Sequence, residues 1–113
     1  MHEVSLVAAL VDQIDEIAQK EGFDRVLGIR IAVGALSGVE PSCLEFCYSE
    51  VTRNTVLEGS KLILEPVGIE LQCKSCGRVS HPKDEAIFCM DCQSGEVVVK
   101  KGREFQILDL EVL

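Results

Sequence analysis

Two closely spaced cysteine pairs constrain the fold of this chain more than any other feature of its sequence. The pattern C-x2-C-x12-C-x2-C is made by Cys73, Cys76, Cys89 and Cys92. Each CxxC turn directs two thiolates toward one point, and Zn²⁺ prefers four such ligands in a tetrahedron. Because four sulfurs fill the coordination sphere, we expect a structural zinc ion and not a catalytic one. The spacing therefore predicts a small zinc-binding module, similar to a zinc ribbon, over residues 71–103.

The cellular compartment decides whether such cysteines bind metal or form disulfides. The N-terminus carries acidic residues in place of a basic, cleavable leader, so no secretory signal is predicted. The longest apolar runs are far shorter than the roughly 20 residues that span a bilayer. We therefore expect a cytoplasmic chain outside the membrane, where disulfides are rare. Disulfide pairing and a thioredoxin-like redox site are the alternatives, although such a site normally needs a single CxxC.

The charge of the chain argues against nucleic acid as a partner. Its 11 Lys and Arg and 19 Asp and Glu give a formal net charge of −8. Phosphate contacts need a concentrated basic surface, which this composition does not supply. Residues 73–103 have an excess of two cations, which a zinc ion with four thiolates would neutralise. We expect this module to contact protein.

The remainder of the chain alternates between helical and strand periodicity. Residues 3–21 repeat apolar side chains at helical spacing up to Gly22, and residues 26–33 alternate with the period of a strand. Pro41 suits the first turn of a second helix, predicted to end near Arg53. Two further strands are predicted at residues 61–65, where Pro66 either ends the strand or places it at a sheet edge, and at residues 104–112.

These elements predict an α+β fold in which two helices cover a three-stranded sheet. The small zinc-ribbon-like module is then an insertion between the second and third strands. The predicted domains are residues 1–70 plus 104–113 for the main α+β domain, and 71–103 for the zinc module.

The first three residues, Met1, His2 and Glu3, have a coordination chemistry of their own. The α-amine of Met1, the amide nitrogen of His2 and its imidazole can form adjoining chelate rings around one ion. A planar nitrogen set of this kind suits Ni(II) or Cu(II), and the amide or carboxylate of Glu3 could complete it. The alternative is an unbound terminal histidine, with Glu3 favouring a helix N-terminus through the macrodipole.

Two further groups in the sequence contain residues that can ligate metals. Cys43 and Cys47 lie one helical turn apart, as a second metal or redox pair would, but we favour the interpretation that both are small buried hydrophobic residues. His81 lies between the two CxxC pairs and is interpreted as an exposed loop residue, with a role near zinc as the alternative.

A family resemblance unites these motifs. The start Met1-His2-Glu3-Val4-Ser5-Leu6, the central segment GALSGVEP at residues 34–41 and the paired CxxC together resemble the HypA/HybF hydrogenase nickel-incorporation proteins. The resemblance covers essentially the whole chain. It departs from the family pattern at Gln93, where a glycine often follows the second pair.

The resemblance implies a metallochaperone that supplies nickel to the [NiFe]-hydrogenase large-subunit precursor, working with a HypB-type GTPase. It implies His2 as the principal nickel ligand beside Met1 and Glu3, and the four cysteines as zinc ligands. The predicted function is therefore a non-enzymatic Ni(II) carrier, acting as a monomer or homodimer. The alternative is a zinc-stabilised protein-interaction adaptor without a nickel role; a zinc hydrolase is disfavoured because no open-site ligand motif is present.

Overall fold

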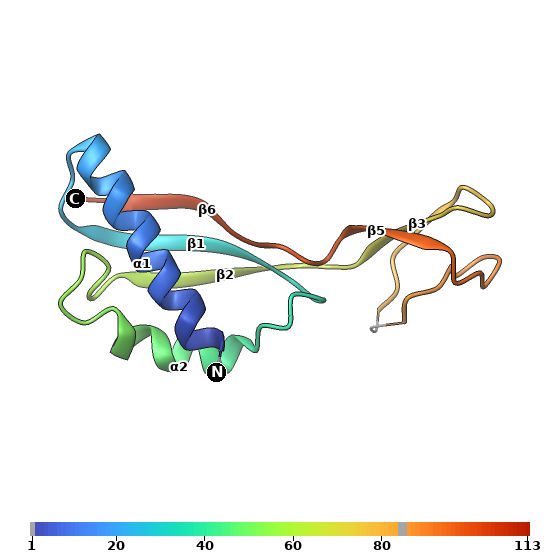
Figure 1. The fold of residues 1–113 in the computed structure, drawn as a ribbon, viewed down its shortest axis with the longest axis horizontal. Coiled ribbons are helices and arrows are strands. Elements are labelled where there is room, and N and C mark those ends of the chain that lie inside the picture. The colour runs from blue at the N-terminus through green and yellow to red at the C-terminus, as the bar shows by residue number, and fades with distance from the viewer. Residues whose placement is uncertain (1, 84–85) are drawn as a thin grey trace. The chain divides into compact units, whose positions relative to one another are not determined.

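The computed structural model describes residues 2–83 and 86–113, and the fold has two helices and six strands (Figure 1). The elements in chain order are α1 His2–Glu21, β1 Val26–Gly34, α2 Pro41–Val51, β2 Lys61–Val67, β3 Glu70–Cys73, β4 Val79–Ser80, β5 Val97–Lys101 and β6 Phe105–Val112. One three-stranded sheet has the order β2-β1-β6 and the second has the order β4-β3-β5. The predicted α+β fold with two helices and a three-stranded sheet is confirmed. No helix in the described part of the chain is both long enough and apolar enough to cross a bilayer.

The chain divides into two compact units, which are described separately. Unit 1 comprises Met1–Ile31, Val39–Leu64 and Ile107–Leu113, and unit 2 comprises Ala32–Gly38 and Glu65–Gln106. The domain boundaries expected from the sequence stay a prediction.

The core of unit 1 joins both helices to β1. From α1, Val7 and Ile14 are fully buried, and from β1 so is Ile31; Leu44 of α2 has no exposed surface either. Figure 1 shows α1 running across the strands. The helical period in α1 and the period of two in β1 thus present apolar side chains to one another, and each fully buried side chain contributes about 1.5–3 kcal/mol of transfer free energy.

Helix α2 begins and ends through specific polar contacts. Glu40 is the N-cap, and its carboxylate accepts a hydrogen bond from the Ser42 backbone N–H at 3.1 Å. Pro41 follows in the first turn, where no intrahelical N–H is needed. At the other end the Thr52 hydroxyl donates to the Tyr48 carbonyl at 2.7 Å, and the helix ends at Val51, slightly before the position expected from the sequence.

In unit 2, β3 is the central strand of the second sheet. It pairs antiparallel with β4 through Leu71 and Ser80, and with β5 through Cys73 and Val97. Leu71 is fully buried, whereas β5 is mostly exposed. Strand β3 ends at the first cysteine of the CxxC pairs, so the sheet positions the start of the candidate metal centre.

Candidate metal centres

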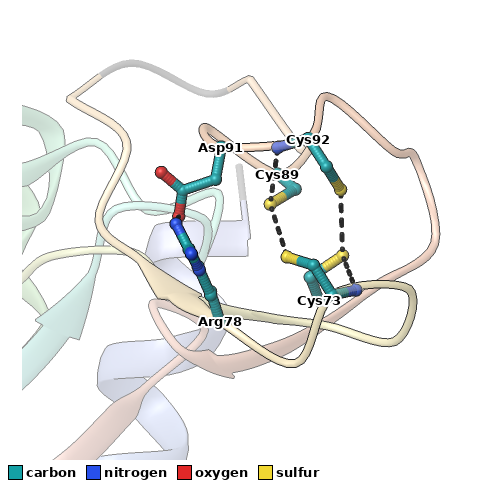
Figure 2. A network of polar contacts seen from close by, with 6 residues as sticks. Cys73, Arg78, Cys89, Asp91 and Cys92 are labelled. Carbon is teal, nitrogen blue, oxygen red and sulfur yellow. Dashed lines mark hydrogen bonds and ion pairs between the residues drawn. The ribbon is translucent and has the colours of Figure 1, made fainter.

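The four cysteines of the paired CxxC motifs converge on one point (Figure 2). Their sulfur atoms all lie within 4.8 Å of one another. The Cys73 and Cys92 sulfurs are 3.5 Å apart, and those of Cys76 and Cys89 are 3.6 Å apart. Zinc–sulfur bonds of about 2.3 Å in a tetrahedron place the sulfurs about 3.8 Å apart, so the cluster has the size that zinc requires. The four-cysteine cluster suits a structural zinc ion.

Each CxxC pair is shaped by the same backbone turn. The Gly77 N–H donates to the Cys73 carbonyl at 3.0 Å, and the Gln93 N–H donates to the Cys89 carbonyl at 2.9 Å. Both donors have a positive φ, 77° at Gly77 and 64° at Gln93. Gln93 therefore makes the turn that glycine makes in the first pair, in a left-handed conformation that is unfavourable for a residue with a side chain.

Backbone N–H groups also point at the sulfurs. Cys73 Sγ accepts from the Ser75 and Cys76 amides at 3.3 and 3.4 Å, and Cys89 Sγ accepts from the Cys92 amide at 3.5 Å. Such donors stabilise thiolates and so support metal ligation. Arg78 lies beside the cluster, 3.9 Å from Asp91, as Figure 2 shows. At that distance on the surface, the ion pair contributes little.

The thiols of the cluster fall into two classes by pKa. The Cys76 backbone N–H lowers the pKa of Cys73 to about 6, and the Cys92 N–H lowers the pKa of Cys89. At Cys92, the Ser94 N–H acts to lower the pKa, but the Cys73 thiol, burial and the remaining thiols together raise it to about 12. Four adjacent thiolates repel one another, so the metal-free cluster retains protons that a bound cation displaces.

Of the three residues expected to hold nickel, His2 and Glu3 lie at the start of α1. Met1 lies outside the described residues, and His2 is the first residue of the helix. Glu3 is in the first turn, and its carboxylate accepts a hydrogen bond from the Glu40 backbone N–H at 3.2 Å. The start of α1 is thereby attached to the start of α2, within unit 1.

Glu40 was not among the residues singled out from the sequence. Its carboxylate accepts hydrogen bonds from the backbone N–H and the hydroxyl of Ser42, the latter at 2.8 Å, while its own N–H donates to Glu3. Glutamate is not among the favoured N-cap residues, but Pro41 at the first helical position places the N-cap at the residue before it and could have identified this role. The approach of Glu3 depends on the packing of α1 against α2, which local sequence does not specify.

The remaining candidate ligands, Cys43, Cys47 and His81, differ in how far they are buried. Cys47 is buried, and its thiol donates to the Leu44 carbonyl at 3.5 Å, in agreement with the interpretation as a small core residue. Cys43 is exposed, so the same interpretation is wrong for Cys43, because it lies on the solvent side of α2. The His81 side chain is 67% exposed and lies 3.3 Å from the Glu70 carboxylate, which confirms an exposed histidine.

Comparison with known proteins identifies relatives over the whole chain. The family model described as hydrogenase/urease nickel incorporation, metallochaperone, HypA, matches residues 1–112. The hydrogenase maturation factor HypA of Methylocella silvestris is 36% identical over 112 residues, covering 99% of both chains. The protein of the same name from Syntrophus aciditrophicus is 35% identical over 113 residues, with 99% of both chains covered.

A solved structure shares the fold. The solution structure of the Ni metallochaperone HypA from Helicobacter pylori matches with a TM-score of 0.75 and 27% sequence identity, covering 100% of this chain and 98% of that one. Sequence relatives, the family model and the fold agree along the full length. This chain belongs to the HypA family of hydrogenase/urease nickel-incorporation metallochaperones.

Proposed function

We propose that this chain carries Ni(II) at its N-terminus and delivers it for maturation of [NiFe]-hydrogenase. The observation that supports this most directly is the match of residues 1–112 to a nickel-incorporation family. The relatives from Methylocella silvestris and Syntrophus aciditrophicus are both named hydrogenase maturation factors. The chain acts as a carrier and not as an enzyme, since its chemistry is ligand exchange.

The proposed nickel ligands are the Met1 amine, the amide nitrogen and imidazole of His2, and a donor from Glu3. The location of His2 and Glu3 in the first turn of α1 supports the proposal. The first N–H groups of a helix have no intrahelical partner, so a metal that replaces their protons breaks no helical hydrogen bond. Few ligands enclose the ion, and soft thiolates of an acceptor site can therefore draw it away.

The proposed zinc ligands are Cys73, Cys76, Cys89 and Cys92. A zinc ion held by four thiolates cross-links the two CxxC turns and leaves no coordination position for water, so it supplies folding energy and no catalysis. The two turns already place each sulfur close to the positions that such an ion needs. We assign zinc a structural role in unit 2.

The proposed partners follow from delivery of nickel in the cytoplasm. The specific partners that we propose are a HypB-type GTPase and the large-subunit precursor of [NiFe]-hydrogenase. Nickel incorporation into an enzyme requires contact with maturation partners, and the family model names both hydrogenase and urease. The acidic chain favours encounter with a basic surface on the partner.

Nickel titration of the zinc-loaded chain tests the proposal. We expect 1:1 binding with a planar, nitrogen-rich absorption spectrum that is lost in His2→Ala and in a chain with residues added before Met1. His81→Ala is the matched control, since the chain has two histidines, and it keeps the affinity and spectrum. Equal nickel affinity in all four proteins would exclude the N-terminal site and favour the zinc-stabilised adaptor.

A further inference from the structure

An exposed aromatic side chain lies on α2 beside the start of α1. Phe46 is 79% exposed, although its neighbours Leu44, Cys47 and Tyr48 on the same helix are buried. It borders a cavity of about 370 Å³ whose lining residues are Glu3, Val4, Ser42, Cys43, Phe46 and Cys47. All of them belong to unit 1. We call these six residues the α1/α2 cavity.

Folding of this chain gains nothing from exposing Phe46. Its ring would bury well over 100 Å² of apolar surface if covered, and a helix position that faces water is usually polar. Val4, also in the cavity, is 49% exposed, and Cys43 is exposed as well. The cavity therefore presents apolar surface that a second molecule could cover.

The surroundings of the cavity are acidic. Glu3 lines it, and Glu45 and Glu50 are exposed on α2 on either side of Phe46 in the sequence, although neither lines the cavity and Glu50 forms an exposed ion pair with Arg53 at 3.3 Å. Asp and Glu outnumber Lys and Arg by seven in unit 1 but by one in unit 2. An apolar cavity within acidic surroundings is complementary to a basic segment that carries an apolar side chain, whereas it repels an acidic one.

We propose that the α1/α2 cavity binds a basic protein segment with one apolar anchor residue, supplied by a protein that exchanges nickel with this chain. The anchor enters the cavity against Phe46 and Val4, and Lys or Arg side chains on either side meet Glu45 and compete with Arg53 for Glu50. A cavity of about 370 Å³ is at the small end of the range for ligand sites, about 300–1,000 Å³, which suits one large side chain. Buried aromatic anchors of this kind commonly dominate a binding interface.

This inference rests on the proposed function and extends it to the transfer of nickel between this chain and its partner. Because Glu3 lines the cavity and is the third residue of the chain, a segment bound there lies beside the proposed nickel ligands. The Glu3 carboxylate accepts from the Glu40 N–H, so the same residue attaches the start of α1 to α2. Docking and metal transfer would therefore take place on one surface.

The test uses the full, zinc-loaded chain labelled for NMR and three synthetic helical peptides. The first peptide carries Lys and Arg around a single Leu, the second has that Leu replaced by Ser, and the third has the cations replaced by Glu. We expect the first peptide to shift the amide signals of Val4, Cys43 and Phe46 and the other two to bind at least about tenfold more weakly. Added salt should weaken the first peptide's binding.

Two substitutions give a matched comparison. Phe46→Ala should weaken binding of the first peptide about tenfold, whereas Leu113→Ala, which truncates a side chain that is 77% exposed at the C-terminus, should leave binding unchanged. Equal binding of the basic and acidic peptides, equal effects of both substitutions, or an absence of shifts at the cavity would each overturn the proposal. His2→Ala should bind the peptide normally, so loss of nickel binding and loss of docking are separate results.

Discussion

At the scale of single residues, the two CxxC turns differ in how well their sequence suits the same backbone. Gly77 and Gln93 occupy equivalent positions and both have a φ in the left-handed region. Glycine adopts this conformation without a steric penalty, while a residue with a Cβ carries a cost of about 1–2 kcal/mol there. The second turn therefore retains strain that the first lacks.

Gln93→Gly should remove this strain and tighten zinc binding. The relief of strain is partly offset by the larger conformational entropy that a glycine loses on folding. We expect zinc binding to become more favourable by about 1 kcal/mol, which corresponds to about a fivefold increase in zinc affinity. Competition with a zinc-binding dye measures the change. Gly77→Gln is the mirror substitution and should weaken zinc binding by a similar factor; a loss of affinity in Gln93→Gly would show that the glutamine side chain itself stabilises the turn.

Zinc loading should release protons, because two of the four thiols hold theirs tightly. The pKa values of Cys76 and Cys92 are raised, whereas those of Cys73 and Cys89 are lowered. Since every ligand must be a thiolate and the thiols of Cys76 and Cys92 keep their protons at neutral pH, we expect release of at least two protons per zinc. Calorimetric titrations in buffers of different ionisation enthalpy count them. Zinc affinity should fall as the pH falls, and an affinity independent of pH would contradict the assignment of thiolate ligands.

At the scale of elements, the end of β1 depends on a close approach of two backbones. The Gly34 N–H donates to the Glu104 carbonyl at 2.7 Å, and the Leu36 N–H donates to the Gly102 carbonyl at 2.6 Å. A Cβ at Gly34 would overlap the Gly102 backbone and lie 2.7 Å from the Arg103 nitrogen. Any side chain at this position must displace main-chain atoms of unit 2.

Gly34→Ala should therefore destabilise the protein by about 1–3 kcal/mol, the usual cost of overpacking. Gly28→Ala is the control in the same strand, because a Cβ there meets its nearest atom at 3.6 Å, an ordinary contact. Denaturant unfolding of the zinc-loaded proteins compares the two substitutions. If both had the same effect, the approach of the two backbones would not be the cause.

The elements whose apolar residues recur at a regular spacing were predictable from the sequence. Helix α1, strand β1 and the start of α2 at Pro41 lie where periodicity and helix-start signals placed them. Pro66 lies within β2, and the sheet tolerates it because β2 is an edge strand, one of the two predicted outcomes.

The second sheet was not predicted, because its strands are too short for a period. β4 has two residues, and β3 has four. The three consecutive valines at the start of β5 are a strand signal, but a continuous run of apolar residues shows no alternation in the sequence. The convergence of four sulfurs followed from the CxxC spacing alone, whereas the contact between Glu3 and Glu40 depends on tertiary packing.

At the scale of the whole molecule, the two units differ in the interactions that stabilise the fold of each one. Unit 1 buries apolar side chains from both helices and from β1, among them Val7, Ile14 and Leu44. In the described part of unit 2, the large buried apolar side chains are Val33, Ile69 and Leu71, accompanied by Cys73 and Cys89. So small a core supplies little folding energy, and a metal cross-link has to provide much of the remainder.

Zinc removal should therefore affect the two units unequally. Structural zinc contributes roughly 10–16 kcal/mol in isolated zinc-finger peptides, more than a small core can replace. After chelation, we expect amides of β3 and β5 to lose most of their hydrogen-exchange protection, while amides in the middle of α1 and of α2 keep theirs, because their apolar partners belong to unit 1. Cys76→Ser should reproduce the effect without chelator, and Cys43→Ser, which alters a cysteine outside the cluster, should not. Full protection of β3 and β5 in the metal-free chain would mean that the sheet is stable by itself, and zinc would then have no structural role.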